Sequence, residues 1–265
     1  MRLARSLALA AGAALVALAP ATAPADPGKV DWGRKVVTCT GSGAANLRDA
    51  DGNRAVARIG AEKAAKLDAL RNCLEGLRGV RLESGRTVGG ALQSDSALAA
   101  KVEGLVRGFR VVGKPRYYDD GGVEMDVEVP LEGALSDALL PRSEPASTPA
   151  PAGGAPAGTS LVVDARGQRV VPAIAPRVRD EGGREIYGPA LLGDAGRRAG
   201  GAVAYAKDLD SARLALGPRL GAAPVVVKAV RAEGADLVIS AADAAALAGK
   251  DLSFLAEGRV VFLAD

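Results

Sequence analysis

The residue types that most often carry catalysis or hold metal ions are scarce in this sequence. It has no histidine and two cysteines, Cys39 and Cys73. Without histidine, the chain offers no imidazole general base, no Ser-His or Cys-His nucleophile pair and no imidazole metal ligand. We therefore predict a protein that is not an enzyme, with no catalytic residues, no metal site and no cofactor.

The two cysteines could form a disulfide, because an exported chain with a pair of cysteines is often bridged. The predicted geometry argues the other way. Cys39 lies near the end of a short predicted strand, and Cys73 lies ~28 Å along a helix from its start, whereas bridged Cα atoms lie within ~7 Å of each other. We expect free thiols in preference to a Cys39–Cys73 disulfide, which stays open as the alternative.

Gly41-Ser42-Gly43 resembles the start of a phosphate-binding loop, because it follows a predicted strand. A dinucleotide fingerprint needs a third glycine where Asn46 stands, and a helix that opens at once. No Walker lysine follows either. We interpret the two glycines as a tight exit from the strand that ends at Thr40, and expect no bound nucleotide.

Two further patterns contain acidic or basic residues. Asp49, Asp51 and Asn53 have the alternate spacing of a calcium loop, but Arg54 and Gly60 stand where the loop needs its glycine and closing glutamate. Arg197-Arg198 could meet a phosphate or an anionic surface, although a solvated helix end is the simpler interpretation. We expect neither pattern to bind a metal or a cofactor.

An acidic row, Glu124, Asp126 and Glu128, alternates with apolar residues on a predicted strand. Paired carboxylates can act as general acid and base, but these would lie on an open face beside Arg110 and Arg116 of the partner strand. Carboxylates in such a setting stay solvated and ordinary in acidity. We expect a charged outer face.

Residues 1–25 have the features of a secretory signal peptide. Arg2 and Arg5 precede an apolar run, Leu7 to Leu18, that is too short to span a membrane, and Ala23-Pro24-Ala25 offers a cleavage site. We expect cleavage near Ala25, no transmembrane span in the mature chain, no lipidation, and a periplasmic or outer-membrane-associated protein. An uncleaved anchor helix is the alternative.

The composition argues against a nucleic-acid partner. The formal charge of +3 falls to +1 without Arg2 and Arg5, and aromatic residues make up 3% of the chain. A protein that tracks a nucleic-acid backbone would show a basic stripe with interleaved aromatic residues.

A long helix is predicted over residues 53–79. Asn53 suits its N-cap and Gly79 a left-handed C-cap. Apolar side chains recur at the spacing of three and four that lines one face of a helix. We expect this stripe to face the core: Val56, Ile59, Leu67, Leu70, Leu74 and Leu77.

The remaining pattern predicts two α+β domains, 26–140 and 160–265, separated by a disordered Pro- and Ala-rich linker at 141–159. The first domain reads β-α-β-α-β-β, with a second helix capped by Ser94 or Asp95 and a hairpin of 109–118 and 123–129. The second, smaller domain contains predicted strands at 161–163, 225–230, 237–239 and 259–263, a hairpin within 172–192, and helices at 203–216 and after Ser240.

The first domain resembles the bacterial envelope lipoprotein family typified by the twenty-kilodalton outer-membrane antigen, and more distantly FlgP and the N-terminal module of FlgT. The resemblance covers about residues 35–135, and residues 160–265 resemble the C-terminal extension of longer members. The segments that carry it keep the order and spacing of the family: 40–43, 61–65, 71–75, 77–80, 87–88, 102–108 and 122–131. It implies two helices on an antiparallel sheet and no catalytic residues. Family members are commonly lipidated at a cysteine that this chain lacks.

These observations predict an exported, non-enzymatic cell-envelope protein that acts through protein–protein contacts. Its partners would be envelope proteins, such as flagellar or outer-membrane assemblies, or further copies of this chain, and the contact would use an exposed sheet edge or the charged hairpin face. The alternative is a periplasmic binding protein that holds a small ligand or cell-wall fragment between its two domains.

Overall fold

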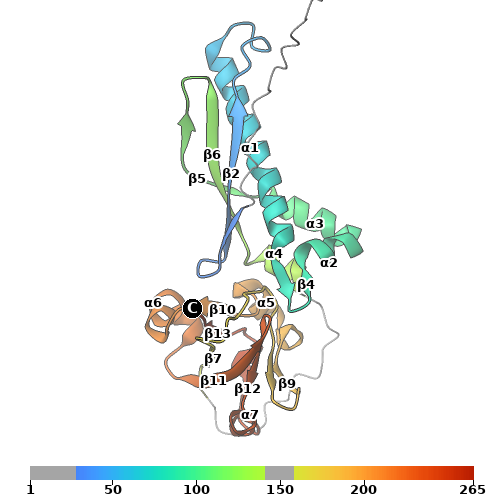
Figure 1. Ribbon diagram of the computed structural model, residues 1–265, viewed down its shortest axis with the longest axis vertical. Coiled ribbons are helices and arrows are strands. Elements are labelled where there is room, and N and C mark those ends of the chain that lie inside the picture. The colour runs from blue at the N-terminus through green and yellow to red at the C-terminus, as the bar shows by residue number, and fades with distance from the viewer. Residues whose placement is uncertain (1–27, 141–157) are drawn as a thin grey trace, which may run out of the picture.

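The computed structural model describes residues 28–140 and 158–265 and shows a mixed α+β protein of two domains. The first domain forms a long, narrow stalk, and the second packs against one end of it (Figure 1). The predicted signal peptide and residues 141–157 of the predicted linker lie outside the described residues. Thr159 belongs to the second domain, since its backbone N–H donates to Ala223 and its side chain to Leu220.

The stalk is an antiparallel sheet with one long helix on its inner face. The strands are β1 (Lys29–Asp31), β2 (Val36–Ala44), β5 (Arg110–Tyr117) and β6 (Gly122–Pro130), and their order is β1-β2-β6-β5. Helix α1 (Arg54–Gly79) runs beside β2 and β6 (Figure 1). The predicted hairpin is confirmed.

The ends of α1 agree with the sequence pattern better than its buried face does. The Asn53 side chain accepts from the backbone of Ala55 and Val56, as predicted for an N-cap. Gly79 is still helical, and the C-cap is Val80 in an extended conformation. The predicted buried stripe is wrong over the outer half of the helix, where Val56, Ile59 and Leu67 are 51%, 52% and 68% exposed. The face that packs on the sheet is lined mainly by small residues: Ala57, Ala61, Ala65, Ala69, Asn72, Cys73 and Leu77.

This small-residue face explains Gly41-Ser42-Gly43, which continues β2 instead of ending it. A β-carbon on Gly41 would overlap the backbone of Ala65 and Ala69, and one on Gly43 would overlap the backbone carbonyl of Ala61. The glycines therefore allow the helix backbone to approach the strand, and the predicted strand end at Thr40 is wrong.

The preference for free thiols is also wrong. Cys39 and Cys73 form a disulfide, with their Cα atoms 5.5 Å apart. Strand β2 leads away from the second domain and α1 returns alongside it, so the start of the strand meets the end of the helix (Figure 1). A distance counted from the start of the helix omits this reversal, which is why free thiols were predicted.

Short elements fill the base of the stalk. They are the hairpin β3 (Arg81–Glu83) and β4 (Arg86–Thr87), and the helices α2 (Val88–Ser94), α3 (Ser96–Val106) and α4 (Ala134–Leu139). Asp95 caps α3 through Leu98, as predicted. Val102 and Val106 of α3 are fully buried and join the main core.

The second domain contains a mixed seven-stranded sheet in the order β10-β13-β7-β11-β12-β8-β9. Pairs β11–β12 and β8–β9 are antiparallel and the other four are parallel. Its strands are β7 (Ser160–Asp164), β8 (Val178–Asp180), β9 (Glu185–Tyr187), β10 (Ala204–Ala206), β11 (Pro224–Glu233), β12 (Asp236–Ile239) and β13 (Val260–Leu263). Its helical segments are η1 (Pro189–Leu191), α5 (Asp194–Gly200), α6 (Leu209–Leu220), α7 (Ala241–Leu247) and η2 (Ser253–Leu255).

The predicted helix at 203–216 is displaced, because β10 occupies its first residues and α6 begins after the cap at Asp208. The cap of α7 is as predicted, since the Ser240 hydroxyl accepts from the Asp243 backbone. None of the helices within 28–140 and 158–265 is long and apolar enough to cross a membrane.

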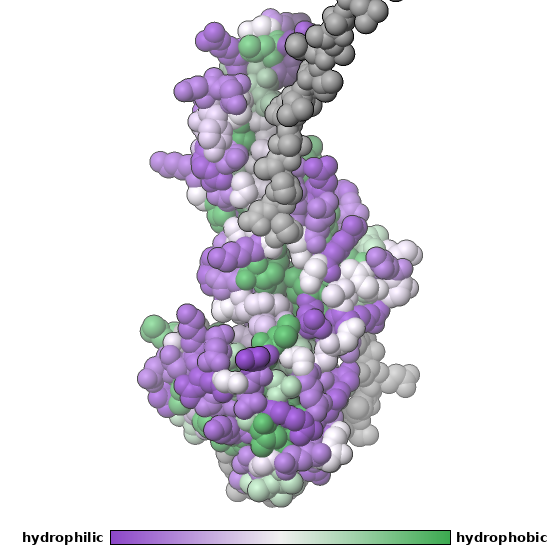
Figure 2. Space-filling view, in the orientation of Figure 1, coloured by the Kyte–Doolittle hydropathy of each residue, from purple (hydrophilic) through white to green (hydrophobic). Residues whose placement is uncertain are grey.

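The two domains share one hydrophobic core. Its buried residues include Val37 and Leu77 of the stalk and Leu161 and Phe262 of the second domain. The backbone N–H groups of Ile174 and Ala175 also donate to the carbonyls of Arg81 and Leu82, at 3.0 and 2.8 Å. On the face shown in Figure 2, hydrophobic side chains are visible where the stalk meets the second domain.

Candidate functional site

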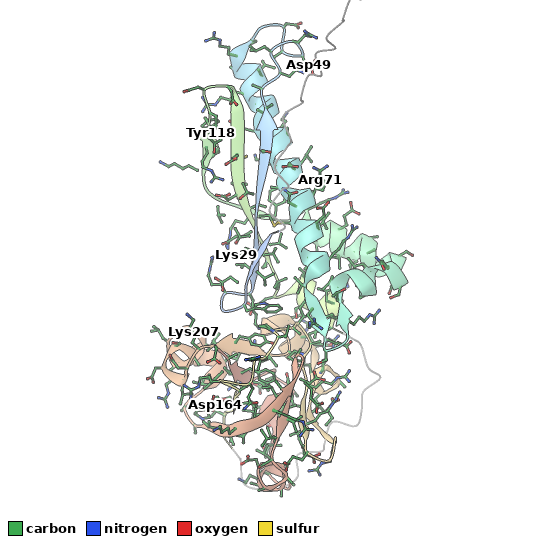
Figure 3. All side chains as sticks on the ribbon, viewed as in Figure 1. Lys29, Asp49, Arg71, Tyr118, Asp164 and Lys207 are labelled. Atoms are coloured by element: carbon green, nitrogen blue, oxygen red, sulfur yellow. A yellow bond between two sulfur atoms is a disulfide. The ribbon has the colours of Figure 1, made fainter. Side chains whose placement is uncertain are left out.

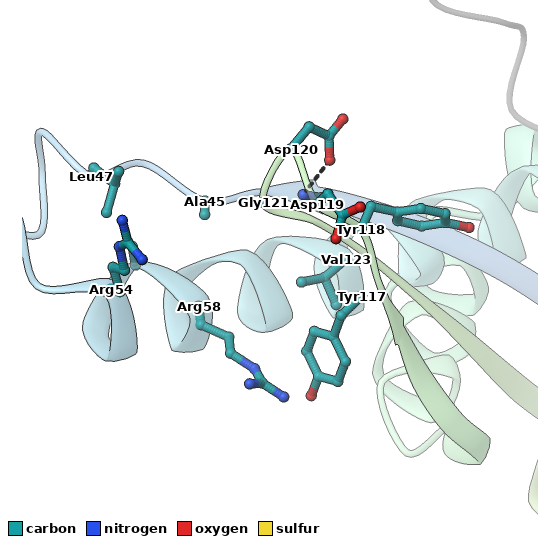
Figure 4. A pocket seen from close by; sticks show the side chains of 12 residues that line it. Ala45, Leu47, Arg54, Arg58, Tyr117, Tyr118, Asp119, Asp120, Gly121 and Val123 are labelled. Atoms are coloured by element: carbon teal, nitrogen blue, oxygen red, sulfur yellow. Dashed lines mark hydrogen bonds between the residues drawn. The ribbon is translucent and has the colours of Figure 1, made fainter.

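The far end of the stalk contains a depression that lies away from the domain contact. The turn between β5 and β6, the loop before α1 and the first turns of α1 enclose about 430 Å³ (Figure 4). Its walls combine aliphatic, aromatic and charged residues: Ala45, Leu47, Arg54, Ala57, Arg58, Tyr117, Tyr118, Asp119, Asp120, Gly121, Gly122 and Val123. We call this region the stalk tip.

The turn fixes one wall of the stalk tip. Gly121 has a φ of +84°, which suits a residue without a β-carbon. The Asp120 carboxylate accepts from the backbone of Gly122 at 2.8 Å, and the backbones of Tyr118 and Gly122 are also hydrogen-bonded. The paired strands therefore hold Tyr117 and Tyr118 in place at the end of β5.

The two tyrosines face different ways. Tyr117 points toward α1, where its hydroxyl donates to Glu62 at 2.8 Å and the Arg58 guanidinium lies 3.8 Å from the centre of its ring (Figure 4). Tyr118 turns away from α1 and donates to Glu124 at 2.8 Å. This hydrogen bond raises the pKa of the Tyr118 phenol. Both tyrosines thus have a hydrogen-bonded hydroxyl, and the two residues are 45% and 48% exposed.

Apolar side chains line the depression beside these rings. They are Ala45, Leu47, Ala57 and Val123, of which Leu47 is 49% exposed. Aromatic residues and arginine are enriched at the energetic centres of protein–protein interfaces. A patch of such groups at the end of a rigid stalk is suited to contact with another molecule.

The open face of the stalk sheet is charged, as predicted, but the expectation that its carboxylates stay solvated and ordinary in acidity is wrong, because Glu128 is buried and the pKa values of Asp126 and Glu128 are lowered. Val123, Met125, Val127 and Val129 of β6 are buried on the helix side. The carboxylates between them meet arginines: Glu124 and Asp126 pair with Arg116, and Glu128 pairs with Arg110 and Arg34. The hydrogen bond from Arg116 lowers the pKa of Asp126, and those from Arg110 and Arg34 lower the pKa of Glu128.

The sheet edges are poor docking sites for another strand. Along β2, Asn72 donates to the Thr40 carbonyl at 2.8 Å and Asp68 accepts from the Ser42 backbone at 3.0 Å, so α1 side chains occupy that edge. Along β5, the register shifts between Val112 and Arg116, where Gly113 has a φ of +70° and Pro115 lacks a donor. Bulges and proline are known protections against edge pairing. The stalk sheet therefore does not favour the predicted contact at an exposed sheet edge, which stays a prediction for the sheet of the second domain.

The contact between the domains contains a buried charged group, Lys35. Its ammonium donates to the carbonyl of Gly200 and lies 3.4 Å from the Glu132 carboxylate. Burial lowers its pKa from an ordinary 10.5 to about 7, and the positive charge of Arg219 acts in the same direction, whereas Glu132 opposes them. Arg219 donates to three carbonyls, of Gly200, Gly201 and Gly258.

A small cavity adjoins Lys35. Its volume is about 20 Å³, and it is lined by residues of both domains, among them Trp32, Ser136 and Ala202. The Ser136 hydroxyl is buried and, within the described residues, has no hydrogen-bond partner. A cavity of this size holds about one water molecule. It is too small for an organic ligand.

Arg197 also lies at the domain contact. Its guanidinium is buried, donates to the Leu140 carbonyl at 2.6 Å and lies 3.5 Å from the Asp137 carboxylate. The predicted solvated helix end is thus wrong for Arg197 and holds for Arg198, which is exposed.

The polar side chains of the acidic loop before α1 form hydrogen bonds within the loop and with the start of the helix. Asp49 accepts from the Asn46 side chain, and Asn53 caps the helix. Within 28–140 and 158–265, no group of three or more acidic, histidine or cysteine side chains is placed to hold a metal ion.

The stalk tip was not among the predicted sites, although the sequence contains one signal for it. Tyr117 and Tyr118 are two of only four tyrosines and directly precede the turn residues Asp119 to Gly122. Two adjacent aromatic residues beside a hairpin turn indicate a surface site, because turns lie at the surface and often carry function.

Comparison with known families supports the division into two domains. Residues 160–265 match the family model described as Treponema pallidum Tp0624, second domain. The match begins where we placed the start of the C-terminal domain. No curated protein matches the chain. The resemblance of residues 35–135 to the envelope lipoprotein family receives no support from these comparisons.

Proposed function

We propose that this chain is an exported, non-enzymatic envelope protein that acts through protein–protein contacts, with the stalk tip as its contact site. The observation that carries the proposal is the exposure of Tyr117, Tyr118 and Leu47 around a depression at the far end of the stalk. A partner that covers these groups removes apolar area from water and leaves their hydrogen bonds intact.

The shape of the stalk suits this role. Helix α1 has 26 residues and spans ~39 Å at ~1.5 Å per residue. The second domain contacts the base of the stalk, so the stalk tip stands clear of it (Figure 1). The second domain would then hold the protein in an assembly while the tip reaches a neighbour.

Export is supported by two features. The first 25 residues have the pattern of a signal peptide, and a buried disulfide joins Cys39 to Cys73. Disulfides persist in the periplasm and in other oxidising compartments. The resemblance to envelope lipoproteins and to FlgP favours partners in outer-membrane or flagellar assemblies.

The alternative is a binding protein for a small ligand or cell-wall fragment. It requires the contact between the two domains to open. The cavity at the domain contact has a volume of about 20 Å³, whereas small-molecule pockets usually measure ~300–1,000 Å³. A ligand there would have to separate two domains that share a core.

Site-specific photo-crosslinking tests the proposed contact. A photoreactive amino acid at position 117 or 118 of the full chain, expressed in its own cells, should give a discrete crosslink to an envelope protein identified by mass spectrometry. The same amino acid at Leu214, which is 92% exposed on α6 of the second domain, is the control. Crosslinks from position 214 and none from the tip would contradict the proposal.

A further inference from the structure

Helix α1 carries a second exposed surface, on the side that points away from the sheet. The alanines at 57, 61, 65 and 69 face the sheet. Residues about half a turn from them share the opposite side. We call this side the outward face of α1: Val56, Ile59, Lys63, Leu67, Leu70 and Leu74.

The outward face is apolar and partly open. Val56, Ile59 and Leu67 are more than half exposed, whereas Leu70 and Leu74 near the base pack partly against the core. The stripe extends over 19 residues, from Val56 to Leu74, or ~27 Å, about five helical turns. Figure 3 shows Arg71 on this helix, across the stalk from Tyr118 on the sheet. None of the six residues of the outward face lines the depression at the stalk tip, so the two surfaces are made of different residues.

Its spacing is that of a helix-pairing surface. The intervals between the six positions are three, four, four, three and four residues. An alternation of threes and fours is the pattern by which one helix receives the side chains of another. Helices that lie on lipid surfaces show the same period, but the stripe here has the narrow form of a helix-pairing seam and not that of a broad apolar face.

The charges within and beside the stripe are basic. Lys63 lies within the stripe and Lys66 beside it, and within the described residues neither forms an ion pair. Two nearby carboxylates are already engaged: Glu62 with Arg58 and Tyr117, and Asp68 with Arg71 and Ser42. Glu75, beside Leu74 at the base of the stripe, is exposed and forms no ion pair within the described residues. The face therefore presents positive charge around its apolar centre.

This charge pattern selects the partner. A second copy of the chain would bring Lys63 and Lys66 against the same lysines and would be repelled. A helix with acidic side chains beside an apolar stripe would pair with both lysines and cover the exposed valine, isoleucine and leucine.

We propose that the outward face of α1 binds an acidic amphipathic helix of another protein. Lys63 sets the register, because a single charged residue inside an apolar helix-pairing stripe requires an opposite charge at one position of the partner. This surface is distinct from the stalk tip, so the two contacts can fail independently.

A peptide titration tests the proposal on the full chain. The probe is a synthetic helical peptide of about four heptads with leucine at both core positions and glutamate at the flanking positions. A second peptide carries lysine in place of every glutamate. We expect the glutamate peptide to bind at least tenfold more tightly than the lysine peptide, and its affinity to fall as salt is raised.

Exchange of charge on the protein gives the decisive comparison. The variant Lys63→Glu/Lys66→Glu should reverse the preference, so that the lysine peptide binds at least tenfold more tightly. Leu67→Gln should weaken the binding of both peptides. The matched controls are Lys101→Glu, an exposed lysine on α3, and Leu214→Gln, an exposed leucine on α6, which should change neither affinity.

Two results would overturn the proposal. One is the absence of binding by the glutamate peptide, or equal affinity for both peptides. The other is binding of the chain to vesicles of anionic phosphatidylglycerol that Lys63→Glu/Lys66→Glu abolishes while glutamate-peptide binding is unchanged, which would assign the face to a membrane surface. Loss of tip crosslinks with intact peptide binding would count against the proposed function alone.

Discussion

Gly41 of β2 and Ala69 of α1 lie so close that no side chain fits between them. A β-carbon on Gly41 would lie 2.6 Å from the Cα of Ala69 and closer still to its backbone nitrogen. Backbone atoms cannot rotate away as side chains do. The separation of helix and sheet along the stalk therefore depends on this glycine, and a larger residue must push α1 outward.

We expect Gly41→Ala to lower the free energy of unfolding by about 3 kcal/mol or more, since overpacking against a rigid backbone is among the costlier core changes. Gly60→Ala is the matched control. Position 60 lies in the same helix with no heavy atom within 4 Å of a new β-carbon, so the change should stabilise by about 0.5–1 kcal/mol. Urea unfolding of both variants measures the two effects, and equal stabilities would contradict the close packing.

The disulfide between Cys39 and Cys73 joins the base of β2 to the end of α1, 34 residues apart in sequence. Cys39→Ala/Cys73→Ala should lose about 2–5 kcal/mol of stability. Thermal unfolding of the wild type with a reductant should approach that of the double variant. Detection of two reactive thiols in unfolded, unreduced wild type would show that the bridge is not formed.

Local sequence patterns predicted the features that depend on residues close together in the chain. The N-cap of α1, the cap of α3 by Asp95 and the β5–β6 hairpin depend on residues close in sequence, and they were predicted correctly. The division into two α+β domains also follows from local patterns, because a Pro- and Ala-rich segment separates them.

Burial could not be predicted in the same way. The helical pattern was interpreted on the assumption that large apolar residues are buried, and Val56, Ile59 and Leu67 were therefore expected in the core. The structure places alanines there, because a glycine-containing strand and a small-residue helix face approach closely. The strand end was misplaced because the two glycines were interpreted as a strand exit, and the disulfide was not preferred because the reversal from β2 into α1 was omitted. The stalk tip was missed because the exposure of Tyr117 depends on where α1 begins relative to the hairpin.

Ser84 connects the two domains through three hydrogen bonds. Its hydroxyl donates to the Glu233 carbonyl at 2.9 Å and accepts from the backbones of Ala235 and Asp236, each at 3.1 Å. Ser84→Ala leaves these backbone groups without that partner and should cost about 1–3 kcal/mol. Ser96→Ala, an exposed helical serine, should be neutral within about 0.5 kcal/mol. Urea unfolding of the two variants measures the difference, and a neutral Ser84→Ala would contradict a stabilising role for the hydroxyl.

Trp32 provides a fluorescence probe of the contact between the two domains. It is the one tryptophan of the chain, and its ring lies 5.5 Å from that of Tyr205 in the second domain. Because the domains share a core, its fluorescence and the far-ultraviolet circular dichroism should report a single unfolding transition. A fluorescence transition that precedes the loss of secondary structure would mean that the domains separate before they unfold.

Lys35 should make stability depend on pH in an unusual direction. Its pKa is about 7 in the folded protein, against an ordinary value of 10.5. Below pH 7 the lysine is protonated in both states, and the folded state bears the cost of a buried ammonium. Between about pH 7 and 10 the unfolded chain keeps this proton while the folded protein releases it. The unfolded state then binds more protons, so the free energy of unfolding should rise with pH, by at most about 1.4 kcal/mol per unit.

Urea unfolding between about pH 7 and 9.5 measures this slope below the range in which tyrosines ionise in the unfolded chain. Lys35→Met should flatten it, because methionine fills the site without a titrating group, and the Gly200 carbonyl still accepts from Arg219. Lys101→Met, at an exposed position, should leave the slope unchanged. Stability that falls with pH in the wild type, or a slope that survives in Lys35→Met, would show that the buried lysine is not the group that titrates.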